Sequence, residues 1–105
     1  MSKLLENVVV ELSRLPGVGR RTALRLAMHI LKMDSEQVGQ MTASIDDFRN
    51  KVCRCAQCNN LSDTEVCEIC SDASRDRTTV CVVEQVADLL SIEKTQQYRG
   101  VYNVL

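Results

Sequence analysis

Apolar residues recur at helical spacing in three stretches of the first half of the chain. Leucines and valines repeat every three or four positions over residues 3–14, which predicts an amphipathic helix. The turn Leu15–Gly19 ends that helix, because its proline cannot continue a helix and its glycines permit a tight reversal. A second helix is predicted at 20–32. A third begins at a cap formed by Asp34 or Ser35, and its apolar face consists of Val38, Met41, Ile45 and Phe48.

The pattern changes after residue 77, where the apolar runs become short and continuous. Residues 80–83 predict a strand, residues 86–93 a helix, and residues 101–105 a second strand. This order opens a βαβ unit, in which the strands run parallel and the sheet normally continues. Two strands and one helix bury too little apolar surface for a stable domain, so we expect an incomplete beginning of one.

The size and composition of the chain point to small aliphatic cores. With 105 residues it holds one or two small units, and a 3% aromatic content leaves its 45% of hydrophobic residues mostly aliphatic. Such cores are marginally stable, so a metal cross-link that contributes roughly 10 kcal/mol of folding free energy would matter. No run approaches the roughly 20 apolar residues that span a bilayer, and we expect no membrane contact.

Two cysteine pairs with C-x-x-C spacing carry the clearest chemistry. Each such turn places two thiolates close enough to share a metal ion, and a second turn completes a tetrahedron. The polar stretch of eight residues between the pairs can fold back as a loop. Four thiolates form a closed, structural site that leaves no position for a substrate. The predicted ligands of one zinc ion are Cys55, Cys58, Cys67 and Cys70.

The alternatives to zinc are two disulfide bonds or four unrelated buried thiols. Neither suits a chain that opens with Met-Ser-Lys and shows no secretory signal, since cytosolic thiols stay reduced. Cys53 could supply a ligand on the first side, but the set without it uses the same turn twice. Cys81 lies in an apolar β-branched run and is expected to be a small core residue. His29 has no organised base or carboxylate partner, so we do not expect it to be catalytic.

Basic residues concentrate in the first third of the chain. Residues 1–33 contain six lysines and arginines against two acidic residues, whereas residues 34–105 contain seven against twelve. Four zinc-bound thiolates would make the second part still more negative. A polyanion should therefore meet the N-terminal segment first.

The first two predicted helices and the turn between them form a helix-hairpin-helix pattern. Gly17 and Gly19 let a phosphate approach the backbone without a Cβ in the way, and free N–H groups at the start of the second helix point towards it. Arg21 and Arg25 lie one helical turn apart and can contact neighbouring phosphates without reading sequence. The alternative is a helical hairpin whose glycines serve only packing.

With these motifs in this order, the chain resembles the bacterial recombination proteins of the RecR family over essentially its whole length. The resemblance also rests on the segments Ser71–Asp76, Val82–Asp88 and Tyr98–Leu105. It implies a small α+β protein made of several modules. These are a helical helix-hairpin-helix domain at 1–51, a four-cysteine zinc finger at 52–71 and a truncated start of a Toprim domain at 78–105. Since the family runs to roughly twice this length, we expect a truncated or proteolysed member.

The resemblance also implies site residues. Arg21 and Arg25 match the basic DNA-contact positions of the family, although many members have Lys at the first of these and Pro at the position of Arg20. The four paired cysteines match its zinc ligands. Glu84 and Asp88 match the first acidic positions of Toprim, which implies a partner-docking or Toprim acidic role.

The function implied by the resemblance is DNA binding in recombinational DNA repair. Members of the family act with RecO to help RecA displace single-strand-binding protein from DNA. They assemble as dimers or as ring-like tetramers around DNA. We therefore expect a bacterial cytoplasmic protein that associates with the nucleoid during repair and carries one structural zinc ion.

Two other classes of function compete with this interpretation. A Toprim-type nuclease or primase would need clustered carboxylates that hold a divalent metal near an attacking oxygen. Glu84 and Asp88 do not supply the second carboxylate pair, and Glu84 can equally be a strand-end carboxylate paired with an arginine, so we expect no catalysis. A zinc-stabilised oligomerisation scaffold would not bind DNA, and substitution of Arg21 and Arg25 would then leave DNA retention unchanged.

Overall fold

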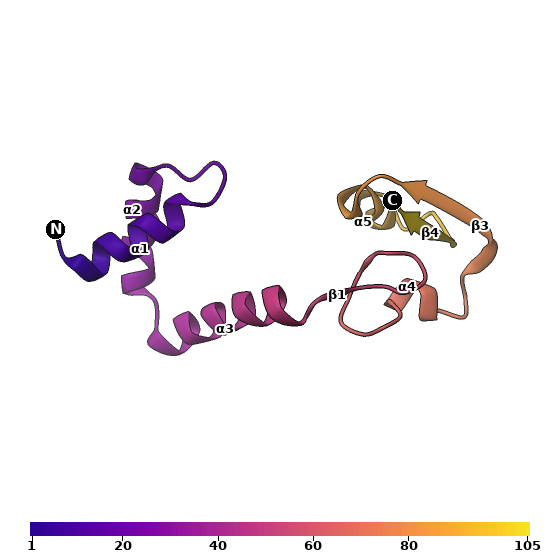
Figure 1. Ribbon diagram of the computed structural model, residues 1–105, viewed down its shortest axis with the longest axis horizontal. Coiled ribbons are helices and arrows are strands. Elements are labelled where there is room, and N and C mark those ends of the chain that lie inside the picture. The colour runs from indigo at the N-terminus through magenta and orange to yellow at the C-terminus, as the bar shows by residue number, and fades with distance from the viewer. The chain divides into compact units, whose positions relative to one another are not determined.

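The protein combines helices with short strands, and the computed structural model describes residues 1–105 (Figure 1). This confirms the predicted α+β class. The chain divides into two units, Met1–Ile45 and Asp46–Leu105, which are described separately. No helix combines the length and the apolar character that crossing a membrane requires. The elements are α1 (Lys3–Ser13), α2 (Arg20–Lys32), α3 (Ser35–Lys51), β1 (Cys53–Arg54), β2 (Leu61–Ser62), α4 (Glu68–Ser71), β3 (Asp76–Val83), α5 (Val86–Lys94) and β4 (Gly100–Val104).

Helices α1 and α2 pack through small buried side chains. Val9 of α1 forms a buried cluster with Ala23 and Ala27 of α2, and the two alanines let the helix backbones approach closely. Val18, in the turn between the helices, packs against the same cluster and anchors the turn. Ser2 caps α1, because its Oγ accepts a hydrogen bond at 3.3 Å from the backbone N–H three residues later. Both helices lie where the apolar periodicity predicted them.

Helix α3 is the third predicted helix, and its cap is Asp34. The Oδ1 atom of Asp34 accepts a hydrogen bond at 3.4 Å from the backbone N–H two residues later. The predicted apolar face is only partly covered. Val38 and Met41 are half-buried, whereas Ile45 and Phe48 remain 62% and 60% exposed. The sequence periodicity thus predicts the helix but not what covers its face.

After α3 come short elements that the sequence did not predict. The stretch between the cysteine pairs was expected to fold back as a loop, but part of it forms β2, which pairs antiparallel with β1 so that Cys53 lies opposite Ser62. The short helix α4 follows. These elements are two to four residues long, and so short a segment contains no apolar period.

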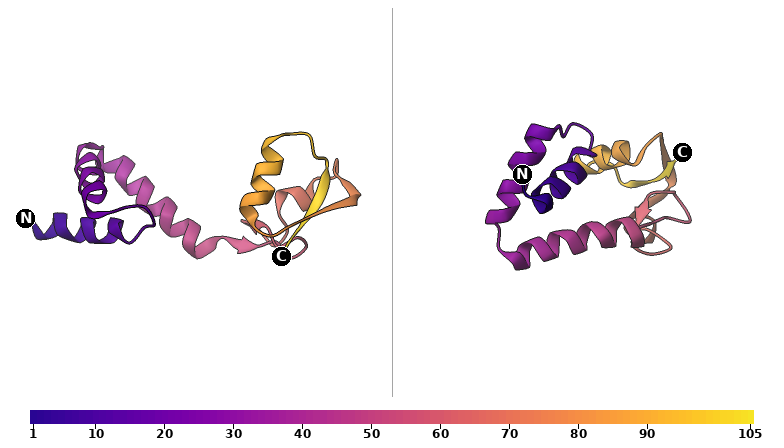
Figure 2. Two further views of the ribbon diagram at one scale, coloured as in Figure 1. Left: turned by 90° about the horizontal axis from the view of Figure 1, so that it is seen from above. Right: turned by 60° about the vertical axis from the view of Figure 1, so that its left-hand side comes forward.

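Strands β3 and β4 run parallel and are connected through α5, which confirms the predicted βαβ order (Figure 2). Strand β3 begins at Asp76, earlier than the predicted start at residue 80. Strand β4 begins at Gly100. Only glycine fits at this position, because a Cβ would collide with the hydroxyl group of Tyr98 and lie 2.6 Å from the carbonyl oxygen of Thr79. The buried core between the sheet and α5 consists of Val83, Leu89, Tyr102 and Val104.

One face of β3 is open to solvent. Val80 and Val82 alternate with the covered residues of the strand and are 54% and 59% exposed. A parallel sheet is normally covered on both faces, which is why its strands read as continuous apolar runs. Strand β3 therefore carries apolar side chains, those of Val80 and Val82, that the 105 residues of the chain do not cover.

Candidate metal centre and nucleic-acid interface

The four paired cysteines converge on one point. Their Sγ atoms all lie within 4.8 Å of one another, and those of Cys58 and Cys67 are 3.6 Å apart. All four residues are buried. A zinc ion with Zn–S bonds of about 2.3 Å places its four sulfurs about 3.8 Å apart in a tetrahedron. The cluster of Cys55, Cys58, Cys67 and Cys70 therefore fits one zinc ion.

Each cysteine pair is shaped by a local turn. Asn59 follows the first pair in the left-handed conformation, with φ of 67°. Its N–H donates to the Cys55 carbonyl oxygen at 2.9 Å, and the Cys55 N–H donates to the carbonyl oxygen of Asn60 at 2.7 Å. In the second pair Cys67 caps α4, so that one turn of helix brings Cys70 back beside it. Two different local structures thus bring together the two sulfurs of each C-x-x-C pair.

Backbone N–H groups point at the sulfurs. The Cys67 N–H donates to Sγ of Cys55 at 3.2 Å, and the Cys70 N–H donates to Sγ of Cys67 at 3.5 Å. Burial opposes ionisation of Cys55, but N–H donors of Cys67, Cys58 and Gln57 outweigh it and lower the pKa of this thiol to about 6. Burial raises the pKa of Cys58 to about 11 and also raises the pKa of Cys70. A bound cation would offset this cost, because zinc binds thiolates.

The two remaining cysteines lie outside the cluster. Sγ of Cys53 donates to the carbonyl oxygens of Ser62 and Thr64, both at 3.3 Å, and Cys53 is not one of the four converging residues. Cys81 is half-buried and packs against the core of the βαβ unit, as its apolar surroundings predicted. The four converging residues are therefore the ligand set predicted from the cysteine spacing, which leaves out Cys53.

The zinc finger is fastened to β4 by two hydrogen bonds. The backbone N–H of Val104 donates to the carbonyl oxygen of Cys58 at 2.8 Å. The side-chain amide of Asn59 donates to the carbonyl oxygen of Val104 at 3.1 Å. Both polar groups of one β4 residue are therefore satisfied by the first cysteine turn. The sequence gives no signal for this contact between residues so far apart.

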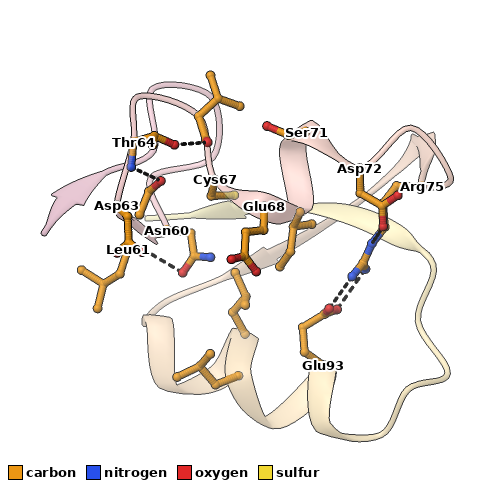
Figure 3. Close-up of a pocket in the computed structure, with 15 residues that line it drawn as sticks. Asn60, Leu61, Asp63, Thr64, Cys67, Glu68, Ser71, Asp72, Arg75 and Glu93 are labelled. Carbon is orange, nitrogen blue, oxygen red and sulfur yellow. Dashed lines mark hydrogen bonds and ion pairs between the residues drawn. The ribbon is translucent and has the colours of Figure 1, made fainter.

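A cleft of about 700 Å³ separates the zinc finger from α5, and a partly buried ion pair lies in its wall (Figure 3). Arg75 donates two hydrogen bonds to the Glu93 carboxylate, at 2.5 and 3.0 Å, and the Tyr102 hydroxyl donates a third at 2.5 Å. Arg75 lowers the pKa of Glu93, while burial and the adjacent Glu93 raise the pKa of Tyr102. No motif in the sequence links residues at this separation, so this network was not predicted.

The turn between α1 and α2 is exposed and open. Gly17 has a φ of 79°, a left-handed conformation that favours glycine, and a Cβ at Gly17 or Gly19 would meet no atom within 4 Å. Gly19 is the N-cap residue of α2 and supplies no side-chain cap, and the first turn of the helix contains no acidic residue. Its first N–H groups are therefore free for an anion.

The arginines beside this turn differ in their surroundings. Arg20 donates two hydrogen bonds to the carboxylate of Glu6, at 2.6 and 2.8 Å, which lowers the pKa of Glu6 and raises that of Arg20. Arg20 thus ties α2 to α1. Arg21 and Arg25 are exposed and make no ion pair or hydrogen bond. Only these two, of the three arginines of α2, keep their charge available for a ligand.

Glu84 and Asp88 lie around the start of α5. Asp88 accepts a hydrogen bond at 3.2 Å from the backbone N–H of Gln85, so it caps the helix. Glu84 is exposed at the end of β3 and makes no ion pair, contrary to the simple pairing with an arginine that the sequence left open. Neither belongs to a group of three or more metal-ligand side chains.

Three family models match successive parts of the chain. The first describes the helix-hairpin-helix of RecR and matches residues 5–49. The second describes the zinc finger domain of RecR, with its four cysteines, and matches residues 52–72. The third describes a Toprim domain and matches residues 78–105. The matched segments contain the open glycine turn, the four converging cysteines and all but the first two residues of the βαβ unit.

Curated relatives match along almost the whole chain. Recombination protein RecR of Flavobacterium johnsoniae is 49% identical over 104 residues, which are 99% of this chain and 50% of the relative. Recombination protein RecR of Bacteroides thetaiotaomicron is 50% identical, over 99% of this chain and 51% of the relative. The chain spans about half the length of these relatives. The open basic turn, the four-sulfur cluster and these matches together show that the chain belongs to the RecR family.

Proposed function

We propose that this chain binds the sugar–phosphate backbone of DNA in recombinational repair. The observation that carries the proposal is the turn at Gly17 and Gly19, which is exposed, uncapped and followed by Arg21 and Arg25 with free charges. Backbone N–H groups and unpaired guanidinium groups are the donors that phosphates accept from. Such contacts hold DNA without selecting a sequence.

The proposed role of the metal is structural. Cys55, Cys58, Cys67 and Cys70 would hold one zinc ion in closed coordination. When bound, the ion supplies a cross-link between the two cysteine turns. The surrounding residues orient the sulfurs through N–H donors and, through Asn59, connect the finger to β4.

The proposal also includes the partners and the cellular location that the family implies. This chain would act with RecO to help load RecA on DNA coated with single-strand-binding protein, as part of a homo-oligomer in the bacterial cytoplasm. Its modules would be residues 1–51, 52–71 and 78–105. The relatives' name, Recombination protein RecR, supports a role in recombination.

We propose no catalytic role for the acidic residues of the βαβ unit. The carboxylate of Asp88 is engaged in capping α5, and Glu84 has no second carboxylate pair beside it. Metal-dependent cleavage of DNA needs several converging carboxylates. Glu84 is instead free to dock a partner.

The double substitution Arg21→Ala and Arg25→Ala tests the DNA proposal. Affinity for a labelled duplex, measured by fluorescence anisotropy in about 50 mM salt, should fall about ten- to a hundredfold, because two phosphate contacts are lost. The control removes two exposed charges away from the turn, through Lys51→Ala and Lys94→Ala, and should bind within about twofold of the original protein. Equal affinity of all three proteins, with unchanged oligomer mass, would instead support a scaffold.

A further inference from the structure

Helix α2 carries a second feature besides the glycine turn at its start. Side chains of α2 alone line a shallow surface hollow of about 490 Å³, which we call the groove. The DNA contact proposed for the turn uses only Arg21 and Arg25 of this groove. The residues that line the groove are Arg21, Leu24, Arg25, Met28, His29 and Lys32.

The basic residues of the groove share one face of the helix. At about 100° per residue, Arg21, Arg25 and Lys32 fall within about 40° of one another around the axis. From Arg21 to Lys32 the helix rises about 16 Å, at about 1.5 Å per residue. Successive phosphates of one DNA strand rise about 3.4 Å along the duplex axis, so this line of charge is long enough to meet more than one of them.

Nothing in the protein neutralises these side chains. Arg21, Arg25, His29 and Lys32 are all exposed and make no ion pair, and α2 itself contains no acidic residue. Arg20 is the contrast, because it points to Glu6 and its charge is balanced there. His29 can donate an N–H to a phosphate in either protonation state, and Lys32 carries a full positive charge.

The apolar lining of the groove is also informative. Leu24 is half-buried and packs against the cluster between α1 and α2, while Met28 is 43% exposed between the basic side chains. A small inorganic anion would make no favourable contact with this apolar surface. The deoxyribose groups that alternate with phosphates along a DNA strand would cover it. Basic and apolar positions that alternate on one helix face thus match the chemistry of a sugar–phosphate chain.

We propose that a DNA strand lies along α2 rather than only at its first turn. His29 and Lys32 extend the contact of Arg21 and Arg25 towards the C-terminal end of the helix, and Met28 packs against a deoxyribose between them. The inference rests on the proposed DNA binding and adds two contact residues to it. It also predicts a larger salt dependence than two arginines alone produce.

The double substitution His29→Ala and Lys32→Ala tests this extension in the full chain. Affinity for a labelled duplex in about 50 mM salt should fall about fivefold or more, and the slope of log affinity against log salt should shrink by about 1, because Lys32 no longer neutralises a phosphate. Replacing Lys3 and Lys51 by alanine removes charge outside the groove and should leave both quantities unchanged. Lys32→Arg should bind like the original protein.

Parallel measurement of Arg21→Ala with Arg25→Ala separates the two proposals. If that variant loses affinity while the His29 and Lys32 variant keeps both affinity and slope, the extended contact is wrong and the binding by the turn stands. If neither variant changes binding, the DNA proposal itself fails.

Two further measurements distinguish loss of DNA contacts from loss of folding in the variants. Met28→Glu places a carboxylate in the middle of the groove and should weaken DNA binding at an unchanged melting temperature. In the unsubstituted protein, DNA should shift the amide NMR signals of residues 28–32 as well as those of the turn and of Arg21 and Arg25. Shifts confined to residues 15–26 would overturn the extension.

Discussion

At the scale of single residues, the charged side chains fall into two groups. Arg20 and Arg75 each donate twice to a carboxylate, of Glu6 and Glu93 respectively, and so hold the protein together. Arg21 and Arg25 have no partner within the chain. The distinction cannot be read from residue type or position in a motif, since Arg20 and Arg21 are adjacent.

The partly buried ion pair of Arg75 and Glu93 should make the stability of the protein depend on pH. Glu93→Gln should lower the free energy of unfolding at pH 7 by about 1–3 kcal/mol, because it removes the nearer carboxylate of the mostly buried Arg75 and leaves only that of Asp72, 3.5 Å from Nε. Arg75 lowers the pKa of Glu93 in the folded protein, so this stabilisation is present above the unfolded pKa of about 4.3 and is lost as the pH falls through the lower folded value.

Urea unfolding at pH 7 and at stepwise lower pH would measure the difference between the two proteins. That difference should shrink with acidification. Glu68→Gln is the matched control, because Glu68 lines the same cleft, is exposed and makes no ion pair. A Glu93→Gln protein as stable as the original at pH 7 would contradict the prediction.

At the scale of elements, the zinc finger and the βαβ unit depend on one another. The first cysteine turn satisfies both backbone groups of Val104, at the end of β4. A two-stranded parallel sheet with one helix has little core of its own. Fixing the cysteine turn by a metal ion therefore also fixes the end of the sheet.

Loss of zinc should consequently loosen β4. Cys58→Ser should release the metal, which costs much of the roughly 10 kcal/mol that zinc contributes to folding. Hydrogen exchange should then show the Val104 N–H losing its protection, while α1 and α2 keep theirs because their core is formed by Val9, Ala23 and Ala27.

The matched control for this experiment is Cys53→Ser, whose sulfur lies outside the cluster. Native mass spectrometry should find one zinc ion per chain in this control and none in Cys58→Ser. A Cys58→Ser protein that lacks zinc yet protects Val104 as before would show that the sheet does not need the metal.

At the scale of the whole molecule, the charge is unevenly distributed. The chain has a net charge of -1, yet its first 33 residues are basic and its remaining residues are acidic. A polyanion is therefore attracted to one unit and repelled by the other. Binding by one copy should be weak, and several copies acting together would raise the affinity without any new contact.

This distribution predicts a steep salt dependence. Between about 50 and 200 mM salt, affinity for a duplex should fall about ten- to a hundredfold if two to four phosphates are neutralised, because released counterions drive the association. Titrations at four or more salt concentrations would give the slope. A flat salt profile would exclude the phosphate contacts, and a scrambled duplex of equal length should bind equally well.

Much of this architecture follows from local patterns. Helices α1, α2 and α5 and the parallel βαβ order were predicted from apolar periodicity, and the four metal-site cysteines from their spacing. The short elements of the zinc finger and the Arg75–Glu93 pair were not predicted. They depend on contacts between distant residues, for which a single sequence carries no period or spacing.

The sequence by itself determined the helices, the glycine turn and the set of cysteines that can share an ion, because each arises from residues close together along the chain. Only the tertiary structure decided which charges remain free. Whether an arginine binds a ligand or a neighbouring carboxylate depends on what the fold places beside it. Arg20 meets Glu6 across the helical hairpin, whereas Arg21, one residue later, turns to another face of α2 and keeps its charge for a ligand.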